Sequence, residues 1–243
     1  MSNHVNAFGQ PIGFPVAHWT PRPRPSRITL EGRICRLEPL SPERHTLDLY
    51  EANQADDGRG WTYMAYGPFA SLEEYRGWVE KSAASEDPLF YTVIDTASGR
   101  ARGVAALMRI DPANGVIEVG NIKYAPALQR TAAATEAMFL LMRYVFDDLG
   151  YRRYEWKCDS LNEPSRAAAL RLGFTFEGIF RQAVVYKGRN RDTAWFSIID
   201  KEWPALKQAY EAWLAPENFD PDGRQRRRLS DLIAEKRAAG SGK

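Results

Sequence analysis

Apolar and polar positions follow regular patterns from about residue 28 to about residue 200. Alternation with a period of two predicts strands, and apolar positions three or four apart predict helices. By these patterns we expect strands at residues 28–40, 89–96, 101–111, 114–126, 151–159, 174–188 and 191–200. We expect helices at residues 42–54, 71–85, 130–150, 162–172 and 201–214. This order of elements predicts a mixed α/β sheet with helices on its faces.

The helix expected at residues 162–172 has clear end signals. Asn162 can accept a backbone N–H as the N-cap, Pro164 is tolerated in the first turn, and Gly173 can adopt the left-handed conformation after the last turn. These signals explain a short helix but assign it no function.

The chain divides into three parts by pattern. Residues 1–27 are rich in proline and predict an extended arm, whose Phe8, Phe14 and Trp19 are apolar enough to dock. Residues 28–200 predict one domain without an internal boundary. Residues 201–243 predict a charged helical extension, and its RQRRR run could contact phosphate, although we favour a solvated helical tail.

Composition narrows the class of protein. The 243 residues carry 33 Lys and Arg against 31 Asp and Glu, so no overall attraction to nucleic acid or membranes is expected. No apolar run approaches the ~20 residues of a membrane helix, and the start of the chain does not resemble a secretory signal. Cys35 and Cys158 form no CxxC pattern, and we expect His45 on the surface, so no metal site is predicted. We expect a cytoplasmic protein.

The junction between the strand expected at residues 114–126 and the helix expected at residues 130–150 predicts an anion site. The strand expected from residue 114 ends at Tyr124, Pro126 interrupts it, and a helix begins near Arg130 with only small side chains before Met138. The free N–H groups and positive dipole of such a helix start bind anions, and a pyrophosphate would fit. Close packing on the sheet is the alternative reason for small residues. A second helix start at Asn162, after the next strand, favours a ligand crevice.

Several motifs in this order resemble those of the GCN5-related N-acetyltransferase (GNAT) superfamily, over about residues 28–200. Within it, the chain is most similar to the ribosomal-protein N-terminal acetyltransferases of the RimJ and RimL type. The matching segments are Glu118-Val119-Gly120 with Pro126 and Gln129, Gln129–Ala134 followed by Thr135-Glu136-Ala137, Asn162-x-x-Ser165 with Leu172-Gly173-Phe174 and Glu177-Gly178, and the late Gly188 and Asp192.

The resemblance implies acetyl-CoA binding on a GNAT fold of about seven strands, with helices on both faces and splayed fourth and fifth strands. It implies that Asn162 contacts the CoA arm and that Ser165 is a general acid for the leaving thiolate. The other implied cofactor contacts are the backbone of Asn121, Ile122, Lys123 and Tyr124 for the pantetheine, and the loop of Gln129, Arg130, Thr131, Ala132, Ala133, Ala134 and Thr135 for the pyrophosphate.

Two positions depart from the family pattern. Ala132 replaces a loop glycine, and Val184 occupies the position where some ribosomal-protein acetyltransferases carry a glutamate base. The base therefore has to be sought elsewhere. Only a neutral amine attacks a thioester, so the ammonium form must first lose a proton. At pH 7 this deprotonation costs about 1.4 kcal/mol for an α-amine but about 4.6 kcal/mol for a lysine. An α-amine thus depends less on a dedicated base.

Glu118 is our candidate base, with a salt bridge across the sheet as the alternative. Tyr186 and Asp192 are lesser candidates, since the late hairpin borders the acceptor side in relatives, and for Asp192 we favour a turn role. For the acceptor pocket we expect the loop at residues 56–70, with Asp56 or Asp57 meeting a cation. Its candidate walls are Trp61, Tyr63 and Tyr66, for which packing is the alternative, and bulk at Met108 and Phe139 could exclude long acyl chains.

The sequence therefore predicts an N-acetyltransferase that moves an acetyl group from acetyl-CoA to a primary amine through a ternary complex. The amine would belong to a small molecule, an amino acid or a peptide N-terminus. The alternatives are transfer to a hydroxyl acceptor, use of a longer acyl donor, and a non-catalytic protein that binds CoA or associates with RNA. A homodimer bridged by the arm is left open.

Overall fold

The computed structural model describes residues 4–240, which form one eight-stranded mixed sheet. Its order is β1-β2-β3-β4-β5-β6-β8-β7, and β5 and β6, the strands expected to splay, form its parallel pair. The strand count exceeds the expected seven by one. The strands are β1 (Leu30–Glu31), β2 (Cys35–Pro39), β3 (Leu89–Asp95), β4 (Ala101–Asp111), β5 (Val116–Tyr124), β6 (Arg153–Asp159), β7 (Thr175–Tyr186) and β8 (Arg189–Ile199).

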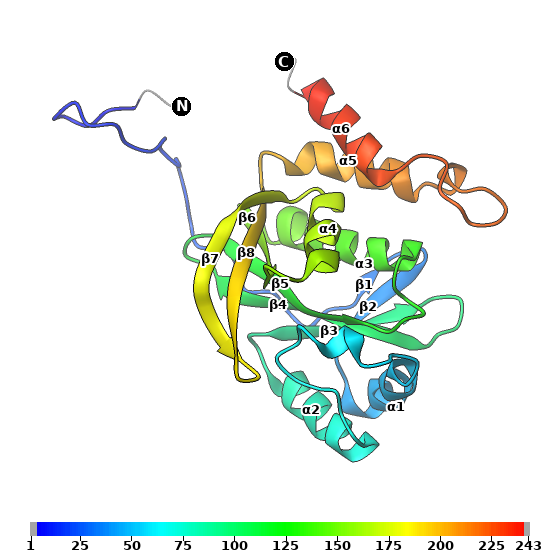
Figure 1. The fold of residues 1–243 in the computed structure, drawn as a ribbon. Helices are drawn as coiled ribbons and strands as arrows, with labels where there is room; N and C mark the ends of the chain where they lie inside the picture. Colours follow the sequence, from blue (N-terminus) through cyan, green and yellow to red (C-terminus); the bar gives the residue numbers. More distant parts are fainter. Residues whose placement is uncertain (1–3, 241–243) are drawn as a thin grey trace.

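Helices cover both faces of the sheet (Figure 1). On one face, α1 and α2 pack over β3 and β4 through a core that includes Leu49, Val79 and Val104. On the other face lie α3, α4, α5 and α6, over a larger core that includes Ile117, Phe196 and Leu206. The helices are α1 (Pro42–Asn53), α2 (Leu72–Ala84), α3 (Ala132–Arg143), α4 (Glu163–Arg171), α5 (Trp203–Leu214) and α6 (Leu229–Gly240).

The extra strand comes from a turn that the sequence pattern does not show. The single strand expected at residues 28–40 is a hairpin of β1 and β2. The carboxylate of Glu136, on α3, accepts hydrogen bonds from the backbone N–H groups of Arg33, Ile34 and Cys35 at 3.0, 2.6 and 2.7 Å. These bonds give the backbone N–H groups of the turn an acceptor, so the chain reverses direction where alternation alone predicts a continuous strand.

The long helix expected at residues 130–150 has a different start and end. It begins at Ala132, with Thr131 as its N-cap, and after Arg143 it continues as one π-helical turn, Tyr144–Asp148. The two-residue delay at the start moves Arg130 out of the helix, into the loop that precedes the cap.

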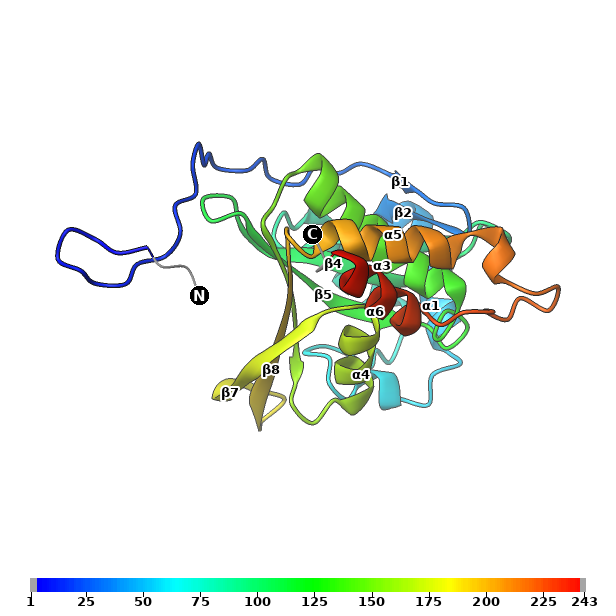
Figure 2. The ribbon, with the colours of Figure 1, turned by 90° about the horizontal axis from the view of Figure 1, so that it is seen from above.

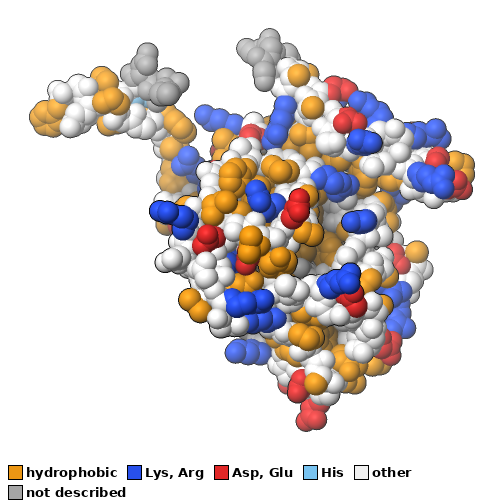
Figure 3. Space-filling view, in the orientation of Figure 1, with side chains coloured by type: hydrophobic (Ala, Val, Ile, Leu, Met, Phe, Trp, Pro, Cys, Tyr) orange, Lys and Arg blue, Asp and Glu red, His pale blue; other side chains and the backbone are white. Residues whose placement is uncertain are grey.

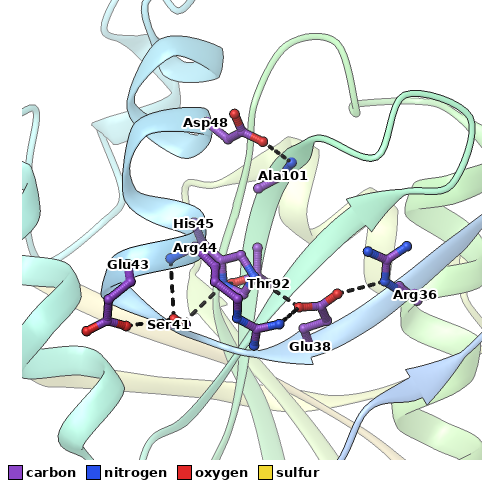
Figure 4. A network of polar contacts seen from close by, with 9 residues as sticks. All are labelled: Arg36, Glu38, Ser41, Glu43, Arg44, His45, Asp48, Thr92 and Ala101. Atoms are coloured by element: carbon purple, nitrogen blue, oxygen red, sulfur yellow. Dashed lines mark hydrogen bonds and ion pairs between the residues drawn. The ribbon is translucent and has the colours of Figure 1, made fainter.

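His45 is buried, so its expected place on the surface is wrong. Its Nε2 lies 3.2 Å from Glu38, and its Nδ1 accepts the backbone N–H of Ser41 at 3.0 Å (Figure 4). Burial lowers the pKa of His45, against the attraction of Glu38. Figure 4 shows the wider network, in which Arg36 and Arg44 also contact Glu38, so this histidine joins α1 to the sheet.

The two ends of the chain behave differently (Figure 2). Trp19 of the arm donates to the carbonyl of Ala113 at 2.8 Å, so it docks as expected, whereas Phe8 is 89% exposed and does not. In contrast, α6 packs on α5 and buries Leu229, Leu232 and Ile233. The expected solvated tail holds for the exposed RQRRR run and for one face of the helix, whereas the domain covers the apolar face of the helix.

Candidate active site

The site begins where β5 and β6 separate. They pair in parallel only from Val116 with Arg153 to Val119 with Trp156. Beyond that point Gly120–Tyr124 pairs with β4 alone, and Asn121 adopts a positive φ of 50° where the register with β4 shifts. The C-terminal ends of the two strands therefore diverge, which leaves the backbone from Asn121 to Tyr124 without a strand partner on its β6 side.

The start of α3 follows this opening. Gln129 donates to the carbonyl of Tyr124 at 2.9 Å, and Thr131 Oγ1 accepts the N–H of Ala134 at 3.1 Å. The first N–H groups of a helix have no partner within it, so those of Ala132 and Ala133 are donors for an anion. Ala132 has no positive φ, so an alanine fits here without strain in place of the family's glycine.

Two further residues of this junction, Arg130 and Thr135, differ in their exposure to solvent. Arg130 is exposed, with a φ of 60°, so its charge lies at the approach to the helix start. Thr135 is buried and accepts hydrogen bonds from Arg171 at 3.2 Å. Thr135 therefore links α3 to the end of α4, and the donors of the first turn and Arg130 are the groups that fit a pyrophosphate.

The start of α4 follows β6 at the same opening. Asn162 Oδ1 caps the helix by accepting the N–H of Ser165 at 3.2 Å, as predicted. Ser165 Oγ in turn accepts the indole N–H of Trp156 at 3.0 Å. The Asn162 amide N–H is left as a donor, and the Ser165 hydroxyl also interacts with the Cys158 thiol. Cys158 lies in the apolar core, where burial raises the pKa of its thiol, which favours a packing role over that of an acyl carrier.

Glu118 is buried on β5 and contacts two cations. Its carboxylate lies 2.9 Å from Lys157 Nζ and 3.1 Å from Arg109 Nε. Lys157 also lies 2.7 Å from Glu155. Burial raises the pKa of Glu118, and the attraction of Lys157 and Arg109 opposes this rise. The salt bridge across the sheet is thus present, and a buried carboxyl with a raised pKa is also suited to exchange a proton.

Strand register places Glu118 on a polar face of the sheet, opposite α3. Glu118 pairs with Glu155 on β6, which pairs with Ser197 on β8. Since side chains two residues apart share a face, the residues of this face can be read along β6 and β8. We call it the polar face; it comprises Glu118, Glu155, Lys157, Asp159, Arg189, Arg191, Thr193, Trp195 and Ser197.

The loop at residues 56–70 borders the polar face, and its five candidate acceptor residues are placed differently. Trp61 is buried with Lys123 Nζ 4.5 Å above its ring, and Tyr63 donates to the carbonyl of Leu161 at 3.0 Å. Tyr66 packs against Trp78 with ring centroids 4.8 Å apart. Asp57 is exposed beside Arg59, whereas Asp56 forms a buried ion pair with Lys123 at 2.6 Å.

The β7–β8 hairpin reaches this loop. Lys187 Nζ donates to the carbonyls of Trp61 and Gly67, both at 2.9 Å, and Arg189 donates to that of Thr62 at 3.3 Å. Tyr186 donates to Asp159 on β6 at 2.9 Å, and burial together with this bond raises the pKa of Tyr186. We call these contacts, with the Asp56–Lys123 pair, the collar; they connect β5, the loop, the hairpin and β6.

Sequence reasoning missed the collar lysines, because a lysine in a strand or turn gives no sign of a partner far along the chain. Asp192 lies in β8, not in a turn, and accepts bonds from Asn190 and from Gln182 at the irregularity of β7, which gives it a structural place in the hairpin. Phe139 stacks on Tyr210 of α5 at 5.3 Å, so its expected place at the acyl end is wrong. Met108 does lie beside the site, paired with Glu118.

Within residues 4–240, no group of three His, Cys, Asp or Glu side chains could hold a metal ion. No helix of that part is long and apolar enough to cross a membrane.

The fold and this site agree with a known family. A family model described as an acetyltransferase (GNAT) domain matches residues 35–175, and the chain belongs to this family of acetyltransferases. The crystal structure of a GCN5-related N-acetyltransferase from Brucella melitensis is 57% identical, covers 90% of this chain and 100% of that chain, and superimposes with a TM-score of 0.89.

More distant relatives confirm the resemblance to the RimJ and RimL type. A Bacillus subtilis protein named "Putative ribosomal N-acetyltransferase YdaF" is 29% identical over 70% of this chain and 92% of its own length. A structure of RimL, a ribosomal L7/L12 α-N-protein acetyltransferase in complex with coenzyme A, is 21% identical over 71% of this chain and 99% of that one, with a TM-score of 0.62. At this identity RimL shows the shared fold.

Proposed function

We propose that this acetyltransferase moves the acetyl group of acetyl-CoA to a primary amine, in a ternary complex and without an acyl-enzyme. The amine is an α-amine of a small molecule, an amino acid or a peptide N-terminus. The observation that carries the proposal is the separation of β5 from β6 directly beyond Glu118, with the capped starts of α3 and α4 at the same opening.

The opening has the donors that acetyl-CoA needs. The N–H groups of Ala132 and Ala133, with Arg130 nearby, suit the pyrophosphate. The backbone of Asn121–Tyr124, which has no strand partner on its β6 side, suits the amides of the pantetheine, and the amide of Asn162 adds a donor. Bound there, acetyl-CoA supplies an activated thioester, so no covalent intermediate on Cys158 is required.

Glu118 and Ser165 suit the two proton transfers. The carboxylate of Glu118 takes a proton from the acceptor ammonium, directly or through a water, so that the neutral nitrogen can attack the carbonyl carbon. The new C–N bond forms as the C–S bond breaks. The hydroxyl of Ser165, oriented by Trp156 at 3.0 Å, donates its proton to the departing sulfur, and its oxygen takes up the second proton that the nitrogen loses on becoming an amide. Tyr186 is bonded to Asp159, and we assign it to positioning of the hairpin.

The experiment measures release of free thiol from acetyl-CoA with a panel of amines, and confirms the acetylated product by mass spectrometry. Transfer to α-amines at pH 7, with little transfer to lysine side chains, is the expected result. The same panel includes hydroxyl acceptors and longer acyl donors. A protein that prefers a hydroxyl to an amine, or a longer acyl-CoA to acetyl-CoA, would contradict this proposal.

The two cysteines support a cytoplasmic location, because Cys35 and Cys158 are both buried and form no disulfide.

A further inference from the structure

The polar face continues past Glu118 onto the β7–β8 hairpin, where cations lack acidic partners. Arg191 donates to Thr193 Oγ1 at 3.1 Å, and Arg189 to the carbonyl of Thr62 at 3.3 Å. Neither arginine forms an ion pair with a carboxylate within residues 4–240, whereas Lys123 and Lys157 beside them each do. Lys and Arg side chains also gather over the end of this hairpin in the space-filling view (Figure 3).

Strand register fixes how far these arginines lie from Glu118. Ser197 is level with Glu118 across the sheet, and Arg191 is six residues from Ser197 along β8. At about 3.4 Å per residue, this separation is on the order of 20 Å. A molecule that places an amine at Glu118 and an anion at Arg191 must therefore be about as long as six residues of extended peptide. A free amino acid is too short.

A free hydrogen-bond donor lies between the two positions. The indole Nε1 of Trp195 is buried and has no hydrogen-bond partner in the described part of the chain. Its ring is held by Lys157, 3.8 Å from the centroid, and by stacking on Phe180 at 4.4 Å. A buried N–H without a partner is costly. A carbonyl of a bound peptide would satisfy it.

From these three observations we propose that the acceptor is a peptide N-terminus followed by acidic residues. The peptide lies extended along the polar face, with its α-amine at Glu118, a carbonyl at Trp195 Nε1, and carboxylates at about its third to seventh positions on Arg189 and Arg191. Arginine binds carboxylates through two parallel hydrogen bonds, which gives such a site its selectivity. This inference rests on the proposed function, since it names the acceptor of the same site.

The test is peptide binding to the protein saturated with CoA, where no transfer occurs. Two labelled peptides of ten residues would share every position except the third to seventh, which carry Asp and Glu in one and Asn and Gln in the other. Fluorescence anisotropy should give at least tenfold tighter binding of the acidic peptide at low salt. The difference should shrink as the salt concentration rises.

Three double variants assign the effect to the hairpin. Arg189→Gln with Arg191→Gln should abolish the difference between the peptides, and the Lys versions of both should keep part of it, because they keep the charge. Arg226→Gln with Arg228→Gln is the matched control, which removes two exposed charges from the C-terminal segment and should leave the preference intact.

Each outcome decides a separate claim. Equal affinity of the wild type for both peptides overturns the inference, and an unchanged preference in the Arg189 and Arg191 glutamine variant overturns its assignment to the hairpin. Acetylation of small amines without any preference for acidic peptides would leave the proposed function standing. Preferred binding of the acidic peptide without acetyl transfer to any amine would overturn the proposed function and keep the binding surface.

Discussion

Glu118 and Glu136 are both buried motif glutamates near the opening, yet their surroundings differ in kind. Glu136 accepts three backbone N–H groups from the turn between β1 and β2. Glu118 contacts the side chains of Lys157 and Arg109. Backbone donors are fixed by the fold, whereas side-chain cations can move. The comparison teaches that Glu136 is built to hold a turn, and Glu118 is built to exchange its partner.

The largest expected effect is that of Glu118→Gln on activity. Removing a general base should lower kcat/KM for an α-amine by about 10²- to 10³-fold. Thermal unfolding measured on the same variant should show a similar midpoint, because glutamine keeps the shape of the side chain. A loss below threefold would mean that Glu118 only bridges the strands.

Glu136→Ala should mainly change stability, whereas Glu118→Gln should mainly change activity. Three buried N–H groups lose their acceptor, so the free energy of unfolding should fall by about 3 kcal/mol. Calorimetry should then show a midpoint lower by about 6 to 12 °C for a chain of this size. Glu136→Gln, which keeps one acceptor oxygen, should lose less. A midpoint within one degree of the wild type would show that the turn does not depend on this carboxylate.

Asn162 separates helix capping from cofactor binding. Asn162→Ala removes the cap and the amide donor, so we expect a loss of about 1 kcal/mol in stability and about tenfold weaker acetyl-CoA binding, which corresponds to a lost hydrogen bond. Asn162→Asp keeps the capping oxygen and lacks the amide donor. Titration calorimetry should therefore find weakened binding in both variants, with stability restored in the aspartate variant. Wild-type affinity in Asn162→Asp would exclude the amide as a ligand.

Lys157→Met should change the pH profile. Glu118 accepts a proton only as a carboxylate, so activity is present above its pKa and falls as the pH drops through it. Lys157 favours the ionised form, so its removal raises the pKa of Glu118 further. The acid limb of kcat/KM should move up by about one pH unit. In a Glu118→Gln background the same substitution should leave the profile unchanged, and a shift that persists there would point to another titrating group.

Local signals were sufficient for much of the fold. Alternation and apolar spacing predicted the order of strands and helices, and Asn162 caps α4 as its position before Pro164 indicated. The splay of β5 and β6 also agrees with the family resemblance. These features depend on neighbours within a few residues or on motifs of fixed spacing.

The remaining features depend on distant partners. The β1–β2 turn is held by a carboxylate about one hundred residues away, and the collar joins Lys187 to Trp61 across an even longer separation. His45 is buried against β3, where Thr92 Oγ1 lies 3.0 Å from its Nδ1. No periodicity reports such pairings, so sequence patterns placed these residues in the right elements without their partners.

The measurement that tests the central claim most directly is calorimetric titration of acetyl-CoA into the wild type and into Ala132→Glu. A carboxylate in the first turn of α3 favours the helix dipole, so it should not unfold the protein, but it repels a pyrophosphate. The account predicts micromolar binding by the wild type and at least tenfold weaker binding by the variant, with an unchanged melting midpoint. No binding by the wild type, or equal binding by both, would contradict a cofactor site at this helix start.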